Sequence, residues 1–212
     1  MMTDLLLVSQ IFSWILILGL AMAVYALARQ IGVLHERIAP MGALMHGNGP
    51  VIGQPAPTIA GMDLDGGVLQ LGGPRADGGN ADRLIVFVAP DCPVCKKILP
   101  IARDLARDEG NAELWLAGEV DSHAAPGSPA VVAHREMLAK LGLASTPVVL
   151  APNVGLQFRI GKLPHAILVD SAGILRAQGL VNTREHLESL FVARESGYTS
   201  IQEYLSGNPA AS

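Results

Sequence analysis

The two cysteines of this chain, Cys92 and Cys95, are separated by two residues, and the 212-residue sequence contains no other cysteine. Two thiols at this spacing can close a disulfide and reopen it by thiolate attack, which is the chemistry of thiol–disulfide exchange. A purely structural disulfide is the weaker interpretation, because so short a loop constrains the unfolded chain very little. The count also excludes a four-cysteine zinc site and a scaffold stapled by several disulfides.

A metal site remains an alternative interpretation of the cysteine pair. Two thiolates and a histidine can hold a soft ion such as copper, and His165 is the best placed third ligand in the sequence. Such a histidine is more often an ordinary surface residue. We therefore expect no metal and no cofactor beyond the Cys92–Cys95 disulfide itself.

The position of the cysteine motif along the chain matters more than its spacing. It follows a continuous apolar run at residues 84–89, LIVFVA, which is typical of a strand covered on both faces. It opens residues 93–108, where apolar side chains recur at helical spacing, although Pro100 is expected to kink this helix. The motif therefore lies where a strand ends and a helix begins. There, free N–H groups and a partial positive charge stabilise a thiolate.

This placement predicts different roles for the two cysteines. We expect Cys92 to be the exposed attacking thiol and Cys95, one helical turn later, to be the buried resolving thiol. Pro93 suits the first helical position, where a backbone N–H has no partner within the helix. Lys96 and Lys97 add positive charge one turn on, while Asp91 opposes it.

The remaining pattern alternates short strands and helices. Residues 65–67 indicate a β-hairpin turn. The other expected elements are strands at 113–117, 147–150, 166–169 and 174–178, and helices at 129–141, 182–194 and 200–205. In the helix at 129–141, the spacing predicts an inner face made of Val132, Met137, Leu138 and Leu141. The main order is β-hairpin, β, α, β, α, β, β, α, with 147–150 as a further strand candidate. This order predicts an α/β fold in which a mixed sheet carries helices on both faces.

The N-terminal region is apolar and long. Residues 5–28 contain no charged side chain, and about 20 such residues cross a bilayer core of roughly 30 Å as a helix. We expect an uncleaved transmembrane helix here, because a signal peptide normally begins with basic residues and residues 1–4, MMTD, contain none. A cleaved signal peptide and a buried core helix are the alternatives. Residues 1–38 then form the anchor and juxtamembrane helix, 39–50 a Gly/Pro linker, and 51–212 the globular domain.

Charge and composition restrict the partners of this chain. The net charge is −4 and only 4% of the residues are aromatic. A nucleic-acid partner would favour a basic surface with aromatic side chains for base stacking, so we expect none. The expected partners are the lipid bilayer, through residues 5–28, and other proteins that exchange disulfides.

The cysteine motif at a strand-to-helix turn resembles the thioredoxin-like family. Residues 51–66, VIGQPAPTIAGMDLDG, resemble the opening hairpin of its TlpA and peroxiredoxin-related branch. The segment PDCPVCKKILP, combined with the anchor sequence WILILGLAMAVYALARQIGVLHERIAP, resembles the MauD family of methylamine utilisation accessory proteins. That resemblance spans nearly the whole chain. It implies a thioredoxin-like fold, preceded by one transmembrane helix, with the globular domain in the periplasm.

The resemblance also implies a task and a partner. The task is disulfide formation or isomerisation during maturation of the small (beta) subunit of methylamine dehydrogenase, which carries many disulfides and a tryptophan-derived quinone. The precursor of that subunit is the implied partner. Because this chain has only one cysteine pair, an unidentified second redox partner must restore the pair after each turnover.

The resemblance further implies a substrate-binding element in front of the strand at residues 166–169. In thioredoxin-like proteins a cis-proline faces the disulfide, and here Pro164 takes that position. Leu163 then presents its backbone where a substrate chain could pair. Thr146–Pro147 is the competing candidate, and both prolines could also be ordinary trans residues.

Three positions depart from neighbouring families. Many thioredoxins carry a buried acid six residues before the first cysteine, and here that residue is Val86. Reductases of cytochrome c maturation often carry Glu three residues after the second cysteine, and here it is Ile98. Peroxiredoxins place Thr or Ser three residues before the reactive cysteine, and here it is Ala89. A periplasmic thiol reductase of the cytochrome c maturation type is thus a weaker alternative, beside a non-catalytic membrane-tethered escort protein.

The distribution of basic residues disagrees with the implied orientation. Arg29 and Arg37 follow the expected span and no basic residue precedes it. The positive-inside rule, applied to these two residues, would leave the globular domain in the cytoplasm. Two arginines are a small bias, so we keep the orientation that the resemblance implies, a single-pass inner-membrane protein with a periplasmic domain.

Overall fold

The computed structural model describes residues 9–25, 50–75 and 78–196, which belong to two compact units, Met1–His46 and Gly47–Ser212. In the first unit, residues 9–25 form a helix in which every side chain is exposed. Among the described residues, no helix has the length and apolarity that a membrane crossing requires. The ends of the expected span 5–28, the juxtamembrane segment, nearly all of the 39–50 linker and the expected helix at 200–205 lie outside the described residues.

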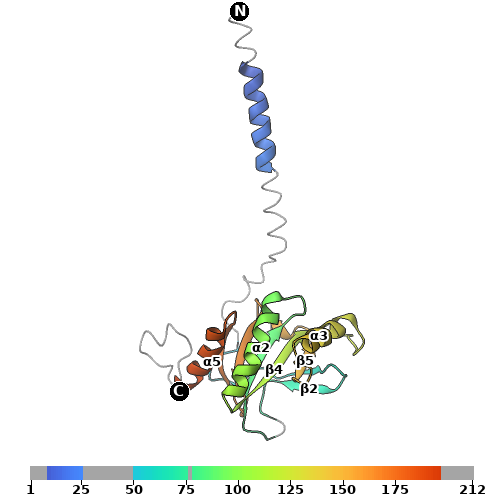
Figure 1. Cartoon of the computed structure of the whole chain (residues 1–212), viewed down its shortest axis with the longest axis vertical. Helices are drawn as coiled ribbons and strands as arrows, with labels where there is room; N and C mark the ends of the chain where they lie inside the picture. The colour runs from blue at the N-terminus through green and yellow to red at the C-terminus, as the bar shows by residue number, and fades with distance from the viewer. Residues whose placement is uncertain (1–8, 26–49, 76–77, 197–212) are drawn as a thin grey trace, which may run out of the picture. The chain divides into compact units, whose positions relative to one another are not determined.

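A mixed β-sheet forms the centre of the second unit (Figure 1). The sheet order is β2-β1-β5-β4-β3-β6-β7. Strands β3, β4 and β5 are parallel to one another, whereas β1, β2, β6 and β7 join by antiparallel pairing. The strands are β1 Ile59–Met62, β2 Val68–Leu71, β3 Asp82–Val88, β4 Ala112–Glu119, β5 Val148–Ala151, β6 His165–Val169 and β7 Leu175–Leu180.

The β3 strand is buried along its whole length, as its apolar run predicts. Side chains alternate between the two faces of a strand. Leu84, Val86 and Val88 accordingly join one core cluster, while Ile85 and Phe87 join the cluster on the opposite face. The two clusters hold β3 rigidly, and its last residue lies four positions before Cys92.

The helices are distributed unequally over the two faces of the sheet. Parallel crossovers are right-handed, and β3-α2-β4 and β4-α3-β5 step across the sheet in the same direction. Helices α2 and α3 therefore cover the face of Val86 and Val88, and α5 packs beside α2 on that face (Figure 1). The short α4 covers the other face through Val154. The helices are α2 Pro93–Asp108, α3 Pro129–Lys140, α4 Val154–Gln157 and α5 Arg184–Ser196.

Most of the expected elements are present, with three differences. The candidate at 147–150 is a full strand, so the element order gains β5. The four-residue α4 was not predicted, because one helical turn is too short to show a periodic pattern. In α3, the pattern predicts Val132 on the inner face, but Val132 is 37% exposed and Val131 is fully buried. The buried face of α3 consists of Val131, His134, Met137 and Leu138. Because His134 is polar, the apolar pattern does not include it, and the predicted face is shifted to Val132.

Candidate active site

The cysteine motif is placed by the end of β3 and the first turn of α2. Cys92 is the N-cap of α2, with an extended backbone (φ −77°, ψ 109°), and Pro93 is the first helical residue. The Cys92 Sγ accepts a hydrogen bond from the Cys95 backbone N–H at 3.1 Å. This is the bond that a side-chain cap makes at a helix N-terminus, with sulfur in place of the usual oxygen. The first turn of α2 contains no acidic residue.

Cys92 and Cys95 form a disulfide, with their Cα atoms 5.3 Å apart. Cys95 is completely buried in the core cluster, whereas Cys92 is partly exposed. The predicted difference in exposure between the two cysteines is therefore confirmed. Cys92 is the cysteine that a reacting partner would meet first.

Charged side chains surround the motif at the surface. Asp91, Lys96 and Lys97 are all exposed, and the Lys96 backbone N–H donates to the Cys92 carbonyl at 3.3 Å. Lys96 ends the first turn of α2 and Lys97 follows it, and positive charge near the start of the helix favours a thiolate at Cys92. Their predicted role in activating Cys92 stays a prediction.

The peptide bond between Leu163 and Pro164 is cis, and no other described bond is. Pro147, the competing candidate, is trans, and its carbonyl accepts from Leu116 N–H in the sheet. The pairing of Phe87 with His165 sets the first residue of β6 beside the end of β3. Pro164 therefore lies at the same edge of the sheet as the cysteine motif. It is buried, while Leu163 is 40% exposed and can be reached by a partner chain.

The residues that replace family-typical groups surround Cys95 with apolar side chains. Val86 is fully buried and Ile98 is 1% exposed, and both belong to the cluster that contains Cys95. Neither position supplies an acid to the buried sulfur. Ala89, partly buried after β3, likewise offers no hydroxyl group to a reacting peroxide.

Two histidines flank this edge of the sheet from opposite faces. His165 pairs with Phe87 and shares its face, whereas His134 is 2% exposed on the face that carries Cys95. Each has a buried Nε2 with no hydrogen-bond partner among the described residues. The sequence alone marked His165 only as a metal ligand, and it gave no signal for His134. In the described part of the chain, no three side chains of His, Cys, Asp or Glu gather as a metal site.

Comparison with known proteins shows the family. The methylamine utilisation protein MauD of Methylorubrum extorquens is 39% identical over 94% of this chain and 92% of its own length. MauD of Paracoccus denitrificans is 40% identical over 96% of both chains. This chain belongs to the MauD family. The family model for TraF, F plasmid transfer operon protein, also matches residues 80–158.

Solved structures show the fold of this MauD-family chain. The thioredoxin domain of a thiol-disulfide oxidoreductase from Bacteroides vulgatus aligns with a TM-score of 0.51 and 19% identity. The alignment covers 67% of this chain and 96% of that domain. The fold is therefore thioredoxin-like.

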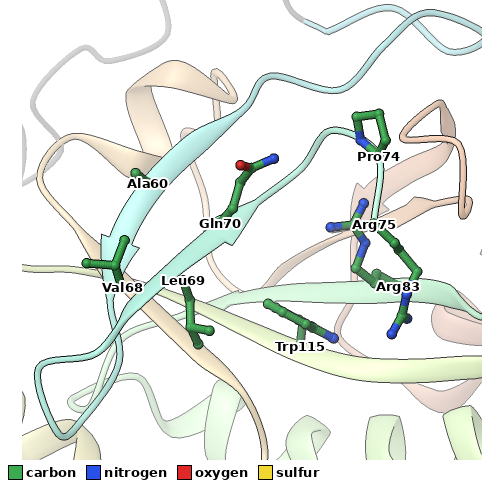
Figure 2. A pocket seen from close by; sticks show the side chains of 8 residues that line it. All are labelled: Ala60, Val68, Leu69, Gln70, Pro74, Arg75, Arg83 and Trp115. Atoms are coloured by element: carbon green, nitrogen blue, oxygen red, sulfur yellow. The ribbon is translucent and has the colours of Figure 1, made fainter. Parts of the chain in front are cut away.

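A hollow of about 460 Å³ lies away from the cysteines, lined by residues of β1 and β2, by Arg83 of β3 and by Trp115 of β4 (Figure 2). Trp115 and Leu69 point into it, and the Arg83 guanidinium carbon lies 6.0 Å from the Trp115 ring centroid. Arg83 stands at the start of β3, so the hollow and the motif are separated by roughly 16 Å along this strand. The hollow is not part of the cysteine site.

The His165 ring should make stability depend on pH. Burial lowers its pKa from the ordinary 6.5 to about 4, so between these values the unfolded chain binds a proton that the folded chain does not. Unfolding free energy should therefore fall by about 3 kcal/mol as pH drops from 6.5 to 4. We expect His165→Gln to flatten this part of the pH profile, measured by chemical denaturation of the full-length chain.

His123→Gln is the matched control, because His123 is exposed. It should leave the slope of unfolding free energy against pH unchanged. An equal slope in His165→Gln and in the unaltered chain would show that the His165 ring is not held neutral by the fold.

Proposed function

We propose that this chain is a thiol–disulfide oxidoreductase in which Cys92 forms the mixed disulfide with the partner and Cys95 resolves it. The observation that carries the proposal is the disulfide at the N-terminus of α2, with one reachable sulfur and one buried sulfur. The cis Leu163–Pro164 bond at the same edge supports it. There the Leu163 backbone is the expected pairing site for an extended substrate segment.

Oxidation of two partner thiols by the Cys92–Cys95 disulfide takes two successive displacements. A partner thiolate attacks the Cys92 sulfur, the Cys92–Cys95 bond breaks, and the electron pair leaves on Cys95. A second partner thiolate then attacks the partner sulfur of the mixed disulfide and releases Cys92 as a thiolate. The partner has lost two electrons and gained a disulfide, and the cysteine pair is left reduced. Isomerisation would start instead from the reduced pair, with the Cys92 thiolate attacking an incorrect disulfide and releasing one partner thiolate. Cys95 resolves the mixed disulfide when its thiolate attacks the Cys92 sulfur, which re-forms the Cys92–Cys95 bond and releases the second partner thiolate.

The proposed substrate is the precursor of the methylamine dehydrogenase small subunit. Membership of the MauD family supports a place in methylamine utilisation, and a subunit with many disulfides needs an oxidant or an isomerase. The sequence has no second cysteine pair. Another redox protein must therefore return the Cys92–Cys95 pair to its working state.

The direction of electron flow separates this proposal from a reductase of the cytochrome c maturation type. Ile98, in place of the glutamate of such reductases, weighs against that alternative. The reduction potential of the pair distinguishes them. A value near about −120 mV is that of a strong oxidant, and one near about −270 mV is thioredoxin-like.

Replacing one cysteine at a time should distinguish a thiol–disulfide oxidoreductase from a non-catalytic escort protein. Cys95→Ser removes the resolving thiol, so a Cys92 thiolate that has attacked a disulfide of the small subunit should stay in the mixed disulfide, seen as a reductant-sensitive band on non-reducing gels. Cys92→Ser removes the reachable sulfur, so it should give no such band and no mature dehydrogenase. If the Cys92→Ser chain still matures the subunit, the protein is a tethered escort and the redox proposal is wrong.

We also propose that the N-terminal helix anchors the chain in the inner membrane, with the globular domain in the periplasm. All side chains of the described helix 9–25 are exposed, and none is charged. Exposed apolar side chains around a whole helix are typical of a lipid-facing segment. The uncharged run continues in the sequence to both sides, over residues 5–28, which supports a span of sufficient length.

A reporter at the C-terminus should reveal this orientation. Alkaline phosphatase is active only after export, so its fusion to the full-length chain should be active in cells. A matched fusion without residues 1–38 should be inactive, because the exporting segment is missing. An inactive full-length fusion, produced at the same level, would place the domain in the cytoplasm, as the positions of Arg29 and Arg37 suggest.

A further inference from the structure

His134 has an unfilled hydrogen-bonding position inside the core. Its Nδ1 lies 2.8 Å from the Ala130 carbonyl, one turn earlier in α3. A carbonyl can only accept, so Nδ1 carries the hydrogen in the neutral ring and Nε2 presents a lone pair. This Nε2 is buried and has no hydrogen-bond partner among the described residues. A buried polar atom without a partner costs stability, so its retention calls for a function.

The fold makes room for this ring next to the cysteine motif. A Cβ on Gly118 would lie 2.4 Å from Nε2, so only glycine at this position leaves space for the imidazole. Gly118 is paired with Val88, the last residue of β3, and shares its face. Val88 and Cys95 belong to one buried cluster on that face. His134 and the buried sulfur therefore lie in the same layer, at the same end of β3.

The charged groups around His134 favour a proton on the ring. Asp91, in the β3–α2 connection, is the charge that acts on it, and the Val88 and Ala130 carbonyls stabilise the protonated form. On α3 itself, Arg135 pairs with Asp65.

The other charged neighbours are directed elsewhere. Glu136 of α3 pairs with Lys140. Glu119, next along β4, points to the opposite face, near Gly155, and on α2 Lys96 and Lys97 are exposed. No other acid among these residues competes with His134 for a proton near Cys95.

We propose that His134 is the proton acceptor for Cys95 when the pair resolves a mixed disulfide. The inference rests on the proposed function. The Cys95 S–H bond breaks and its proton passes to Nε2, while the Cys95 sulfur bonds to the Cys92 sulfur and the partner leaves as a thiolate. In the reverse direction, protonated His134 returns the proton to Cys95 as the disulfide opens. In the oxidised pair Cys95 has no proton to donate, which agrees with the empty Nε2.

His134 would supply the proton acceptor that β3 lacks. The position that carries a buried acid in many thioredoxins is Val86, on the same face of the sheet. Burial lowers the pKa of His134, although the Ala130 carbonyl, Asp91 and the Val88 carbonyl oppose this. The ring is therefore neutral near pH 7 and able to accept. Below its pKa the lone pair is occupied, so resolution should slow as the pH falls.

The test measures the resolving step in the full-length chain. The reduced protein is mixed with oxidised glutathione, and acid-quenched samples are analysed by mass spectrometry for the Cys92–glutathione adduct. His134→Asn keeps an N–H for Ala130 but cannot accept a proton. It should slow decay of the adduct by roughly 10²-fold near pH 7, as expected for loss of a general base, and remove the His134 titration from the pH profile. Val131→Ala, on the same buried face of α3, should change neither.

The outcomes separate this inference from the proposed function. If His134→Asn and Val131→Ala decay alike at every pH, His134 is structural and the inference is wrong, while the exchange function stands. If the unaltered chain never resolves the adduct, the proposed function itself fails. Should His134→Asn not fold, NMR titration of the His134 ring in the unaltered chain decides. The inference expects the ring to titrate differently when the pair is reduced, because Cys95 then carries a proton that faces Nε2, and equal titrations in both redox states would overturn it.

Discussion

The site depends on one interaction, the hydrogen bond from the Cys95 backbone N–H to the Cys92 sulfur at 3.1 Å. A helix must begin at Cys92, because only the first turn leaves N–H groups free to face a sulfur. That requirement fixes the neighbouring elements. The buried β3 strand must end four residues earlier, and α2 must pack one face against the sheet so that Cys95 is buried while Cys92 is not.

The rest of the fold completes the surroundings of that sulfur. Antiparallel pairing of β3 with β6 brings the cis Leu163–Pro164 bond to the same edge, so a reachable sulfur and a reachable backbone segment lie together. Parallel pairing of β3 with β4 brings Gly118, and with it the His134 ring, to the other side of this edge. The cysteine pair, Gly118, His134 and Leu163–Pro164 thus lie toward one end of the sheet, although these groups are far apart in the sequence.

Much of this arrangement could be predicted from the sequence, because its signals are local. The apolar run before the cysteines identifies β3, the periodicity after them identifies α2, and the spacing identifies the redox pair. Pro164 was predicted through the resemblance to thioredoxin-like proteins, since proline type and position do not by themselves specify a cis bond.

What the sequence did not reveal depends on tertiary contacts. His134 appears polar in the pattern of α3, so Val132 seemed to face the core. Its burial depends on a glycine 16 positions earlier in another element, and single-sequence periodicity carries no such information. The short α4 was missed because one turn has no measurable period. The membrane anchor at residues 5–28 stays a prediction, because only residues 9–25 of this segment are described.

The central claim is that the start of α2 gives the two sulfurs unequal reactivity. It is tested most directly by reducing the full-length chain and following iodoacetamide labelling of Cys92 and Cys95 separately, by peptide mass spectrometry near pH 7. The account predicts that Cys92 is labelled much faster than a cysteine in an unstructured peptide, while Cys95 stays protected until the chain unfolds. Equal labelling of both cysteines, or a Cys92 no faster than the peptide, would contradict it.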